Sequence, residues 1–142
     1  MKDLINTEIG ELYFGNQEYI SAKTTFEELK NMKGTIDHSF EALETGIQNL
    51  SFFNKEIDGK SYMISVHFDF QKLVMIFIRF DDGKQLIESP LWNQMKPLKK
   101  DNHTKHLHKK MFTKEKKYDW GKLHAFYSPK TNLGMIDITY KI

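Results

Sequence analysis

The fold is decided by residues 61–80, which read SYMISVHFDFQKLVMIFIRF. Large apolar side chains alternate through the first half and share one strand face: Tyr62, Ile64, Val66, Phe68 and Phe70. Residues 73–80 are apolar on both faces, which is typical of a central strand covered on both sides, or on one side and at an interface. The stretch predicts two neighbouring strands, with the alternating set facing the core.

Hairpins flank this stretch on both sides. Asp58-Gly59 separates a strand at about 50–57 from one at about 61–70. Near the carboxy terminus, apolar residues alternate on either side of a turn at 128–132: Leu123, Ala125 and Tyr127 before it, and Ile136, Ile138 and Tyr140 after it. Leu12 and Phe14 mark a short first strand that ends in a turn at Gly15-Asn16. These patterns predict a mainly antiparallel sheet.

A helix is predicted over residues 25–33. Thr24 and Glu27 have the spacing of a capping box, apolar residues follow at helical spacing, and Gly34 stands where a helix ends. Residues 35–46 fit a helical period but also contain Gly46 and are short, so they are left unassigned.

A second group of helices is predicted after residue 88. Ser89 would cap a helix with Pro90 at its first position, and Leu91 and Met95 would form its buried stripe. Pro97 should interrupt that helix. A further helix, capped by Asp101 or Asn102, would carry Leu107 and Met111.

The order of elements predicts one α+β domain over residues 1–142. We expect an antiparallel sheet of about five or six strands with two or three helices packed on one face. The core face of the 61–70 strand should pack against the helix at 25–33.

Composition points to a cytoplasmic protein that no membrane anchors. The chain has no cysteine, which excludes disulfides, thiolate nucleophiles and cysteine-ligated zinc and fits a reducing compartment. The amino terminus lacks the apolar run of a secretory signal, and the longest apolar run, at residues 73–78, is far shorter than a membrane-spanning helix.

Charge is unevenly distributed along the chain. Residues 1–50 hold four lysines and nine acidic residues, whereas residues 96–117 hold nine lysines and two acidic residues. Arg79 is the single arginine, and arginine is the side chain best suited to guanine contacts, so sequence-specific DNA reading is disfavoured. The Lys-rich segment 96–117, including Lys109 and Lys110, is more typical of a solvated helix or loop, with contact to nucleic acid or to a protein as alternatives.

Metal binding is disfavoured. On a helix His103 and His106 would share one face, but His108 would point elsewhere, and six nearby lysines would repel a cation. We therefore expect no metal and no organic cofactor.

An enzyme is also disfavoured, because the chain has no nucleophile elbow and no Gly-rich phosphate loop. The best catalytic candidate is His67 with Asp69, which share one strand face and could serve a hydrolase.

Two aromatic residues near the carboxy terminus are candidate partner-binding residues. Trp120 opens the last hairpin beside Gly121, and Tyr127 lies near that hairpin's turn. The competing interpretation, that Trp120 caps the core, is the one favoured.

The carboxy-terminal stretch Trp120-Gly121, Tyr127-Ser128-Pro129-Lys130 and a β-branched strand ending in Tyr140 resembles small uncharacterised cytoplasmic proteins of low-GC Gram-positive bacteria. Residues 12–16 and 24–28 are similar to the same proteins. This chain has Ser128 where their pattern has Asp, so no role of that carboxylate carries over.

Some proteins of that group resemble immunity proteins encoded beside polymorphic toxins. The resemblance implies a non-enzymatic protein-binding function, with neutralisation of a cognate toxin as its concrete form. An acidic face built from residues 1–50 would suit a basic toxin nuclease.

Overall fold

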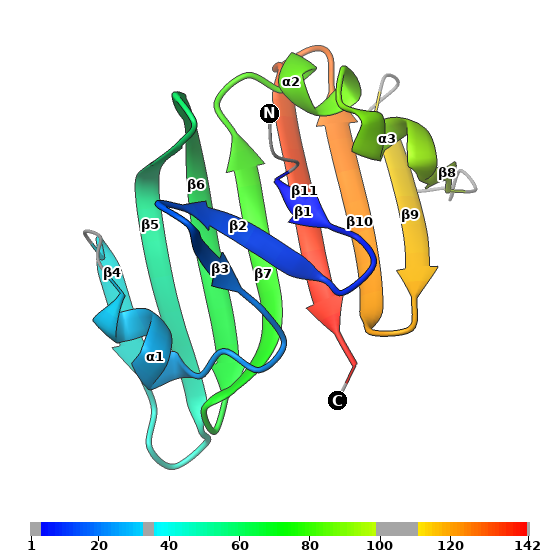
Figure 1. The fold of residues 1–142 in the computed structure, drawn as a ribbon. Coiled ribbons are helices and arrows are strands. Elements are labelled where there is room, and N and C mark those ends of the chain that lie inside the picture. Colours follow the sequence, from blue (N-terminus) through cyan, green and yellow to red (C-terminus); the bar gives the residue numbers. More distant parts are fainter. Residues whose placement is uncertain (1–3, 33–35, 99–110, 142) are drawn as a thin grey trace.

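The computed structural model describes residues 4–32, 36–98 and 111–141. Its main element is an eight-stranded antiparallel sheet with the order β4-β5-β6-β7-β11-β10-β9-β8 (Figure 1). The strands are β4 (His38–Glu41), β5 (Ile47–Ile57), β6 (Lys60–Asp69), β7 (Lys72–Phe80), β8 (Lys96–Pro97), β9 (Phe112–Tyr118), β10 (Gly121–Ser128) and β11 (Leu133–Tyr140). Two four-stranded meanders, β4–β7 and β8–β11, therefore meet where β7 pairs with β11.

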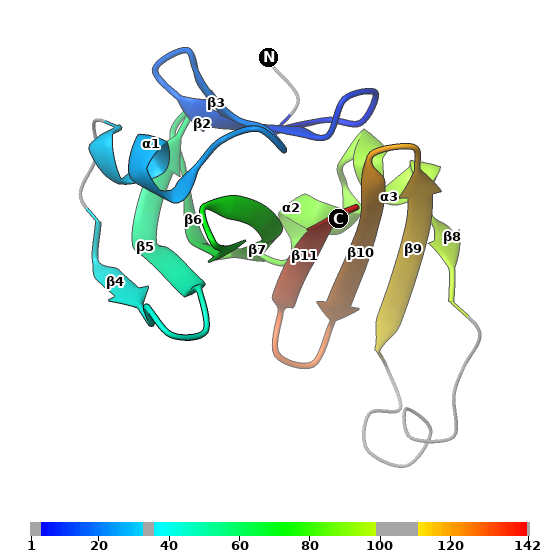
Figure 2. The same cartoon turned by 90° about the horizontal axis from the view of Figure 1, so that it is seen from below.

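A second, three-stranded sheet lies across one face of the large sheet (Figure 2). It consists of β1 (Ile5–Asn6), β2 (Glu11–Gly15) and β3 (Glu18–Ile20), and α1 (Phe26–Asn31) follows it on the same side. The α+β class and the antiparallel sheet are confirmed. The predicted number of five or six strands is wrong, because the chain has eight strands in one sheet and three in another.

The core lies between the two sheets. The ring of Phe14 in β2 meets that of Phe52 in β5 edge to face at 4.9 Å, and Phe26 in α1 meets Phe68 in β6 in the same way at 5.7 Å. The helix at 25–33 therefore packs on the predicted face of the 61–70 strand.

Four of the five residues predicted for that core face are buried: Tyr62, Ile64, Val66 and Phe68. The fifth, Phe70, is 67% exposed, so its assignment to the core is wrong. Phe70 and Gln71 form the two-residue turn between β6 and β7, and both have positive φ. A two-residue turn of this kind requires left-handed backbone conformations, which glycine, asparagine and aspartate usually supply. This turn has none of these residues, so the sequence does not indicate it.

The small sheet is held to the large one by side chains from the β9–β10 turn and from β11. Trp120 Nε1 donates to the Thr7 carbonyl at 2.8 Å, and the Tyr140 hydroxyl donates to the Gly10 carbonyl at 2.7 Å. Gly10 has a φ of 71° and lies directly against the Trp120 ring, so a side chain at this position would collide with the indole. Trp120 is thus a core cap, as the favoured interpretation had it.

The predicted helix at 25–33 is present but shorter, and its cap is shifted by one residue. Thr25, not Thr24, is the N-cap and accepts from the Glu28 amide at 3.1 Å. The Thr24 hydroxyl accepts from the Ser21 amide instead. Gly34 lies outside the described residues.

Two further helices, α2 (Lys84–Ile87) and α3 (Pro90–Gln94), follow β7. Ser89 caps α3 and Pro90 occupies its first turn, as predicted. The buried residues are Trp92 and Met95, whereas Leu91 is only partly buried. None of the helices in the described part of the chain is long and apolar enough to cross a membrane.

The lysine-rich segment departs from expectation where it is described. Residues 112–118 form strand β9, between β10 and β8, and not a solvated helix or loop. The helix predicted after Asp101, with Leu107, lies outside the described residues.

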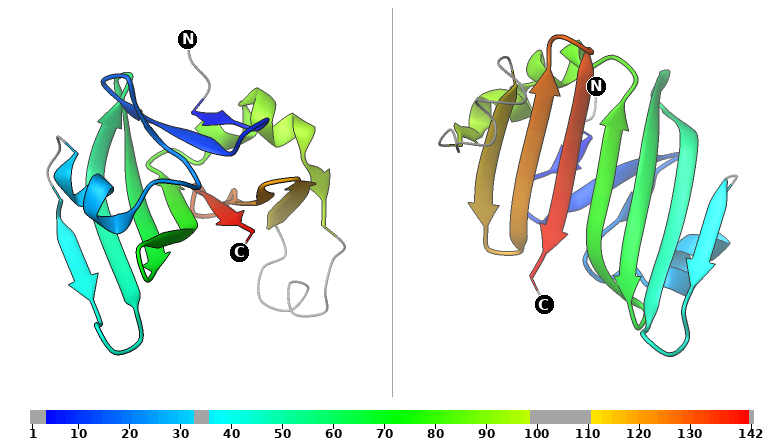
Figure 3. Two further views of the ribbon diagram at one scale, coloured as in Figure 1. Left: turned by 60° about the horizontal axis from the view of Figure 1, so that its bottom comes forward. Right: turned by 180° about the vertical axis from the view of Figure 1, so that it is seen from behind.

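The second face of the large sheet carries no covering layer from the described residues, as Figure 3 shows from behind. Residues on this face alternate with the core residues along β5, β6, β7 and β11. We call it the open face.

Candidate functional site

A cluster of exposed apolar side chains lies at the end of the β4–β7 meander. Phe40, Leu43, Ile47 and Phe70 are 46%, 83%, 48% and 67% exposed. Phe40 pairs with Asn49 across β4 and β5, which places it on the same strand face as Ile47. Leu43 belongs to the β4–β5 turn and Phe70 to the β6–β7 turn.

A backbone hydrogen bond joins the β4–β5 turn to the β6–β7 turn, and a second one closes the β4–β5 turn itself. The Ala42 amide donates to the Ile47 carbonyl and the Phe70 amide donates to the Gly46 carbonyl, at 2.8 and 2.9 Å. Gly46, at a φ of 75°, lies against the Phe70 ring with no room for a side chain. Local backbone geometry therefore holds the Phe70 ring at the surface.

A buried glutamine reinforces this arrangement. Gln48 is 5% exposed, its amide nitrogen donates to a Glu41 carboxylate oxygen at 2.6 Å, and its amide oxygen accepts from the Gln71 backbone at 2.7 Å. The Gln71 side chain in turn accepts from the Glu27 amide of α1 at 3.1 Å. A series of hydrogen bonds through Gln48 and Gln71 thus connects the surface cluster to α1.

The charges around the cluster are mostly negative. Residues 36–54 contain no lysine or arginine. They contribute Asp37, Glu41 and Glu44, and Asp69 pairs with Ile47 across β5 and β6. Lys72, opposite Asp69 in β7, is the nearest basic residue in the strand register. Glu41 accepts from Gln48 and Asp37 accepts from the Phe53 amide at 2.7 Å, so the carboxylates left beside the apolar residues are Glu44 and Asp69. We call the four apolar residues together with Glu44 and Asp69 the acidic–apolar corner.

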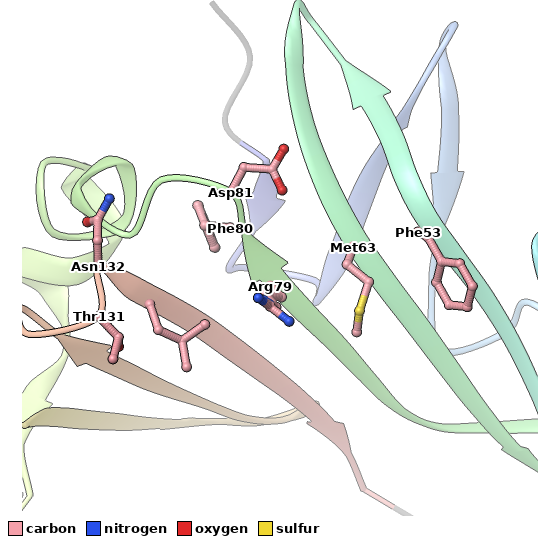
Figure 4. A pocket seen from close by; sticks show the side chains of 8 residues that line it. Phe53, Met63, Arg79, Phe80, Asp81, Thr131 and Asn132 are labelled. Atoms are coloured by element: carbon pink, nitrogen blue, oxygen red, sulfur yellow. The ribbon is translucent and has the colours of Figure 1, made fainter.

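The open face continues from this corner to a shallow pocket of ≈ 380 Å³ (Figure 4). Phe53, Met63 and Arg79 line it from three adjacent strands, and Asp81 and Asn132 close it at the strand ends. Phe53 is 50% exposed. The accessible lining of this pocket is more polar than apolar, and it includes one cation, Arg79, and one carboxylate, Asp81.

His67 lies on the open face, but its hydrogen bond is not to Asp69. Its Nε2 lies 3.2 Å from the Ser65 hydroxyl, which lies 3.4 Å from that of Ser51. Burial lowers the pKa of His67 below its ordinary value. No carboxylate contacts His67 among the described residues. Ser65 and His67 therefore lack the third group that normally orients the base of a serine nucleophile.

The other predicted partner-binding residues are not gathered at one surface. Trp120 stacks on Tyr118 at 5.1 Å and 7°, and it is committed to the small sheet. Tyr127 is 5% exposed, with its ring against Gly83. Lys109 and Lys110, like His103, His106 and His108, lie outside the described residues.

Two lysines of the described part of the basic segment are engaged within the chain. Lys114 donates to the Trp92 carbonyl at 3.1 Å and lies 4.8 Å from the centre of the Trp92 ring. Lys116 lies 5.4 Å from the centre of the Tyr118 ring. Neither ammonium group extends freely toward a phosphate backbone.

Sequence reasoning misses the acidic–apolar corner, because residues 35–46 fit no single pattern and the alternation of residues 62–70 predicts that Phe70 faces the core. Its available signal was the run of residues 36–54 without a basic side chain. No protein-family model, curated protein or solved structure matches the chain, so the case for function rests on this geometry.

Proposed function

We propose that this chain is a non-enzymatic protein-binding domain, with neutralisation of a cognate toxin as its concrete form, and that it binds its partner through the acidic–apolar corner. The observation that carries the proposal is the exposure of Phe40, Leu43, Ile47 and Phe70 at one end of the sheet. Aromatic and aliphatic side chains exposed together are the usual centre of a protein interface.

The charges define the partner's chemistry. Glu44 adjoins Leu43 in the β4–β5 turn and Asp69 lies opposite Ile47, so the partner should offer an apolar patch with lysines and arginines at its rim. A basic nuclease toxin meets this description. Complementary charge would speed association, and the apolar centre would hold the complex together.

The proposal places the protein in the cytoplasm, where an immunity protein would meet the toxin. The absence of cysteine supports this, since such a chain needs no oxidising compartment.

The test begins with the neighbouring open reading frames. If one encodes a large protein with a toxin-like carboxy-terminal domain, co-expression of this chain should protect cells from that domain. The double variant Phe40→Ser/Phe70→Ser should fail to protect at an equal protein level. The matched control Lys117→Glu, an exposed charge on β9, should protect as the wild type does.

The two alternatives are nucleic-acid binding through residues 96–117 and a hydrolase that uses His67 and Asp69, and the salt dependence of binding tests the first of them. Nucleic-acid binding would weaken steeply with salt and with Lys109 and Lys110 changed to Glu, whereas the proposed complex should keep most of its affinity at moderate salt. Absence of protection together with no binding at micromolar concentration would reject the proposal for that toxin.

A further inference from the structure

The two outer strands of the large sheet differ in how they expose their backbone. β8, at one side, consists of Lys96 and Pro97, and lysine and proline are among the residues with which natural proteins block an exposed strand edge. β4, at the other side, has four residues, all exposed, and contains neither lysine nor proline. Figures 1 and 3 show β4 as the outermost strand. The outer edge of β4 is therefore the less protected edge of this sheet.

The hydrogen-bond pattern of β4 shows which backbone groups face outward. The Ala42 amide donates to the Ile47 carbonyl at 2.8 Å, so Ala42 bonds to the β5 side. In an antiparallel pair every second residue bonds to the neighbouring strand, and the residues between them direct their N–H and C=O groups the other way. These outward groups belong to Ser39 and Glu41. They meet no partner strand in the described part of the chain.

The side chains of β4 alternate between the two faces of the sheet. Phe40 lies on the open face beside Asn49, whereas Glu41 lies beside Gln48 on the other face. A strand added outside β4 would place one residue directly opposite Phe40, at the close spacing of a non-hydrogen-bonded pair. Its two neighbours would lie opposite Ser39 and Glu41. An apolar residue suits the position opposite Phe40, and a basic residue suits the position opposite Glu41.

Charge distinguishes a partner's strand from the β4 strand of a second copy. Residues 36–54 contain Asp37, Glu41 and Glu44 and no lysine or arginine, and none of these carboxylates forms an ion pair within the described residues. Two copies joined at β4 would bring two such acidic segments together, which like-charge repulsion opposes. A strand that carries basic residues would instead meet complementary charge.

We infer that the β4 edge binds an extended segment of the partner protein by strand addition, and that this segment alternates basic and apolar residues. Backbone hydrogen bonds to Ser39 and Glu41 hold the segment, and the Phe40 ring and the Glu41 carboxylate select its side chains. The inference rests on the proposed function, because it names the part of the partner that docks at the acidic–apolar corner.

The first arm of the test uses a synthetic peptide of seven residues with capped ends, in which four lysines alternate with valine, phenylalanine and valine. The peptide is titrated into the full chain, with protein NMR shifts as the readout. We expect a Kd of about 1 mM or tighter, with the largest amide shifts in residues 38–42. The same peptide with glutamate in place of lysine should bind about tenfold more weakly or worse.

The second arm tests the backbone hydrogen bonds without changing the protein. N-methylation of the two central lysines of the peptide removes donors that face β4, whereas N-methylation of its two valines removes donors that face solvent. The peptide methylated at lysine should bind about tenfold more weakly than the parent peptide, and the one methylated at valine should bind within about twofold of it.

The third arm changes the outward-facing amide of Ser39. Ser39→Pro removes this donor and leaves the apolar side chains of the acidic–apolar corner in place, so it should weaken binding of the parent peptide about fivefold or more. The matched variant Ser39→Thr keeps the donor and should bind the peptide as the wild type does. In the co-expression assay Ser39→Pro should fail to protect and Ser39→Thr should protect. The pair of methylated peptides decides the matter if Ser39→Pro does not fold.

Equal binding of the two methylated peptides, shifts that lie outside residues 38–42, or no shift at about 10 mM peptide would overturn the inference. So would a dimer of the chain alone that Ser39→Pro dissociates in sedimentation analysis, because a second copy would then occupy the edge. Protection that survives Ser39→Pro but is lost in Phe40→Ser/Phe70→Ser would reject strand addition and leave the proposed function standing. Failure of the wild-type chain to protect would reject the proposed function for that toxin, while the peptide arms still test the edge.

Discussion

The two meanders of the large sheet have the same strand pattern and opposite surface character. Residues 36–80 hold six acidic and four basic side chains, whereas residues 111–141 hold six lysines and three acidic side chains. Five of the large apolar residues exposed in the described structure belong to the first segment, namely Phe40, Leu43, Ile47, Phe53 and Phe70, and only Phe112 belongs to the second.

The difference shows how each meander uses its long side chains. In β8–β11 the side chains of Trp120 and Tyr140 form hydrogen bonds to the small sheet. The Lys114 side chain lies over the Trp92 ring. In β4–β7, Phe40 on strand β4 and Phe70 in the β6–β7 turn are exposed, with no described element over them. One meander therefore completes the fold, and the other leaves apolar surface for a partner.

The largest expected effect is at the junction of the meanders. Ile138 in β11 is fully buried and pairs with Ile76 in β7. Ile138→Ala should lower the free energy of unfolding by about 3–4 kcal/mol, through lost transfer free energy and the cavity left behind. Urea unfolding followed by circular dichroism and by fluorescence should still give one shared transition.

Thr139→Ala, the neighbouring change on the open face, is the control and should cost little. Two separate transitions in the wild type, or a loss below about 1 kcal/mol for Ile138→Ala, would show that the meanders are not one cooperative unit.

A smaller loss is expected where the second meander holds the small sheet. Trp120→Ala removes the ring stacked on Tyr118, packed on Gly10 and bonded to Thr7, and should cost about 3 kcal/mol. Trp120→Phe keeps a ring but loses the N–H donor and should cost about 1–1.5 kcal/mol. Equal unfolding midpoints for the wild type and both variants would contradict the anchoring role.

The first meander should also make stability depend on pH. Burial lowers the pKa of His67 in the folded state, whereas the unfolded chain has the ordinary value of about 6.5. The unfolded state then binds more protons, so this contribution to stability is complete above about pH 6.5 and is lost as the pH falls through the folded-state pKa. His67→Gln should flatten the decrease in unfolding free energy between pH 7.5 and 5.5.

The direct check is an NMR titration of the His67 imidazole. A titration midpoint at or above about 6.5, or an unchanged pH dependence in His67→Gln, would contradict the burial of this side chain.

The smallest effect on stability is expected at the acidic–apolar corner. Phe40→Ser and Phe70→Ser replace side chains that are 46% and 67% exposed, so each should change the free energy of unfolding by less than about 0.5 kcal/mol. Thermal unfolding of the two variants measures this. A loss above about 1.5 kcal/mol would mean that these rings belong to the core, and would remove the case for a docking surface.

The alternation of residues 61–68 and the Asp58-Gly59 turn were enough to predict the central hairpin. Asp58 and Gly59 both adopt positive φ, which is the turn chemistry that such a dipeptide indicates. The Phe70-Gln71 turn also has two positive φ values but contains no glycine. The apolar alternation of the preceding strand therefore extends to Phe70 in the sequence, although the strand itself ends at Asp69.

Strand β9 escaped prediction because its inward positions are lysines. Lys114 and Lys116 lie over aromatic rings through their side chains, so a half-buried strand reads as a charged run. β1 and β8 have two residues each and owe their pairing to tertiary contacts that no local pattern reveals.

The candidate site was the least predictable part. Its four apolar residues come from a strand, two turns and the start of another strand, and hydrogen bonds through Gln48 bring them together. Only the charge bias of residues 36–54 was readable in advance. The predicted catalytic residues His67 and Asp69 form no hydrogen bond with each other, because the His67 ring bonds to Ser65 on the same strand.

Amide hydrogen exchange of the chain, alone and bound to the toxin-like domain encoded beside it, tests the central claim most directly. The account predicts slower exchange on binding for the amides of residues 38–47 and 69–72, with no change across 112–118. Protection confined to 112–118, with the corner unaffected, would contradict it.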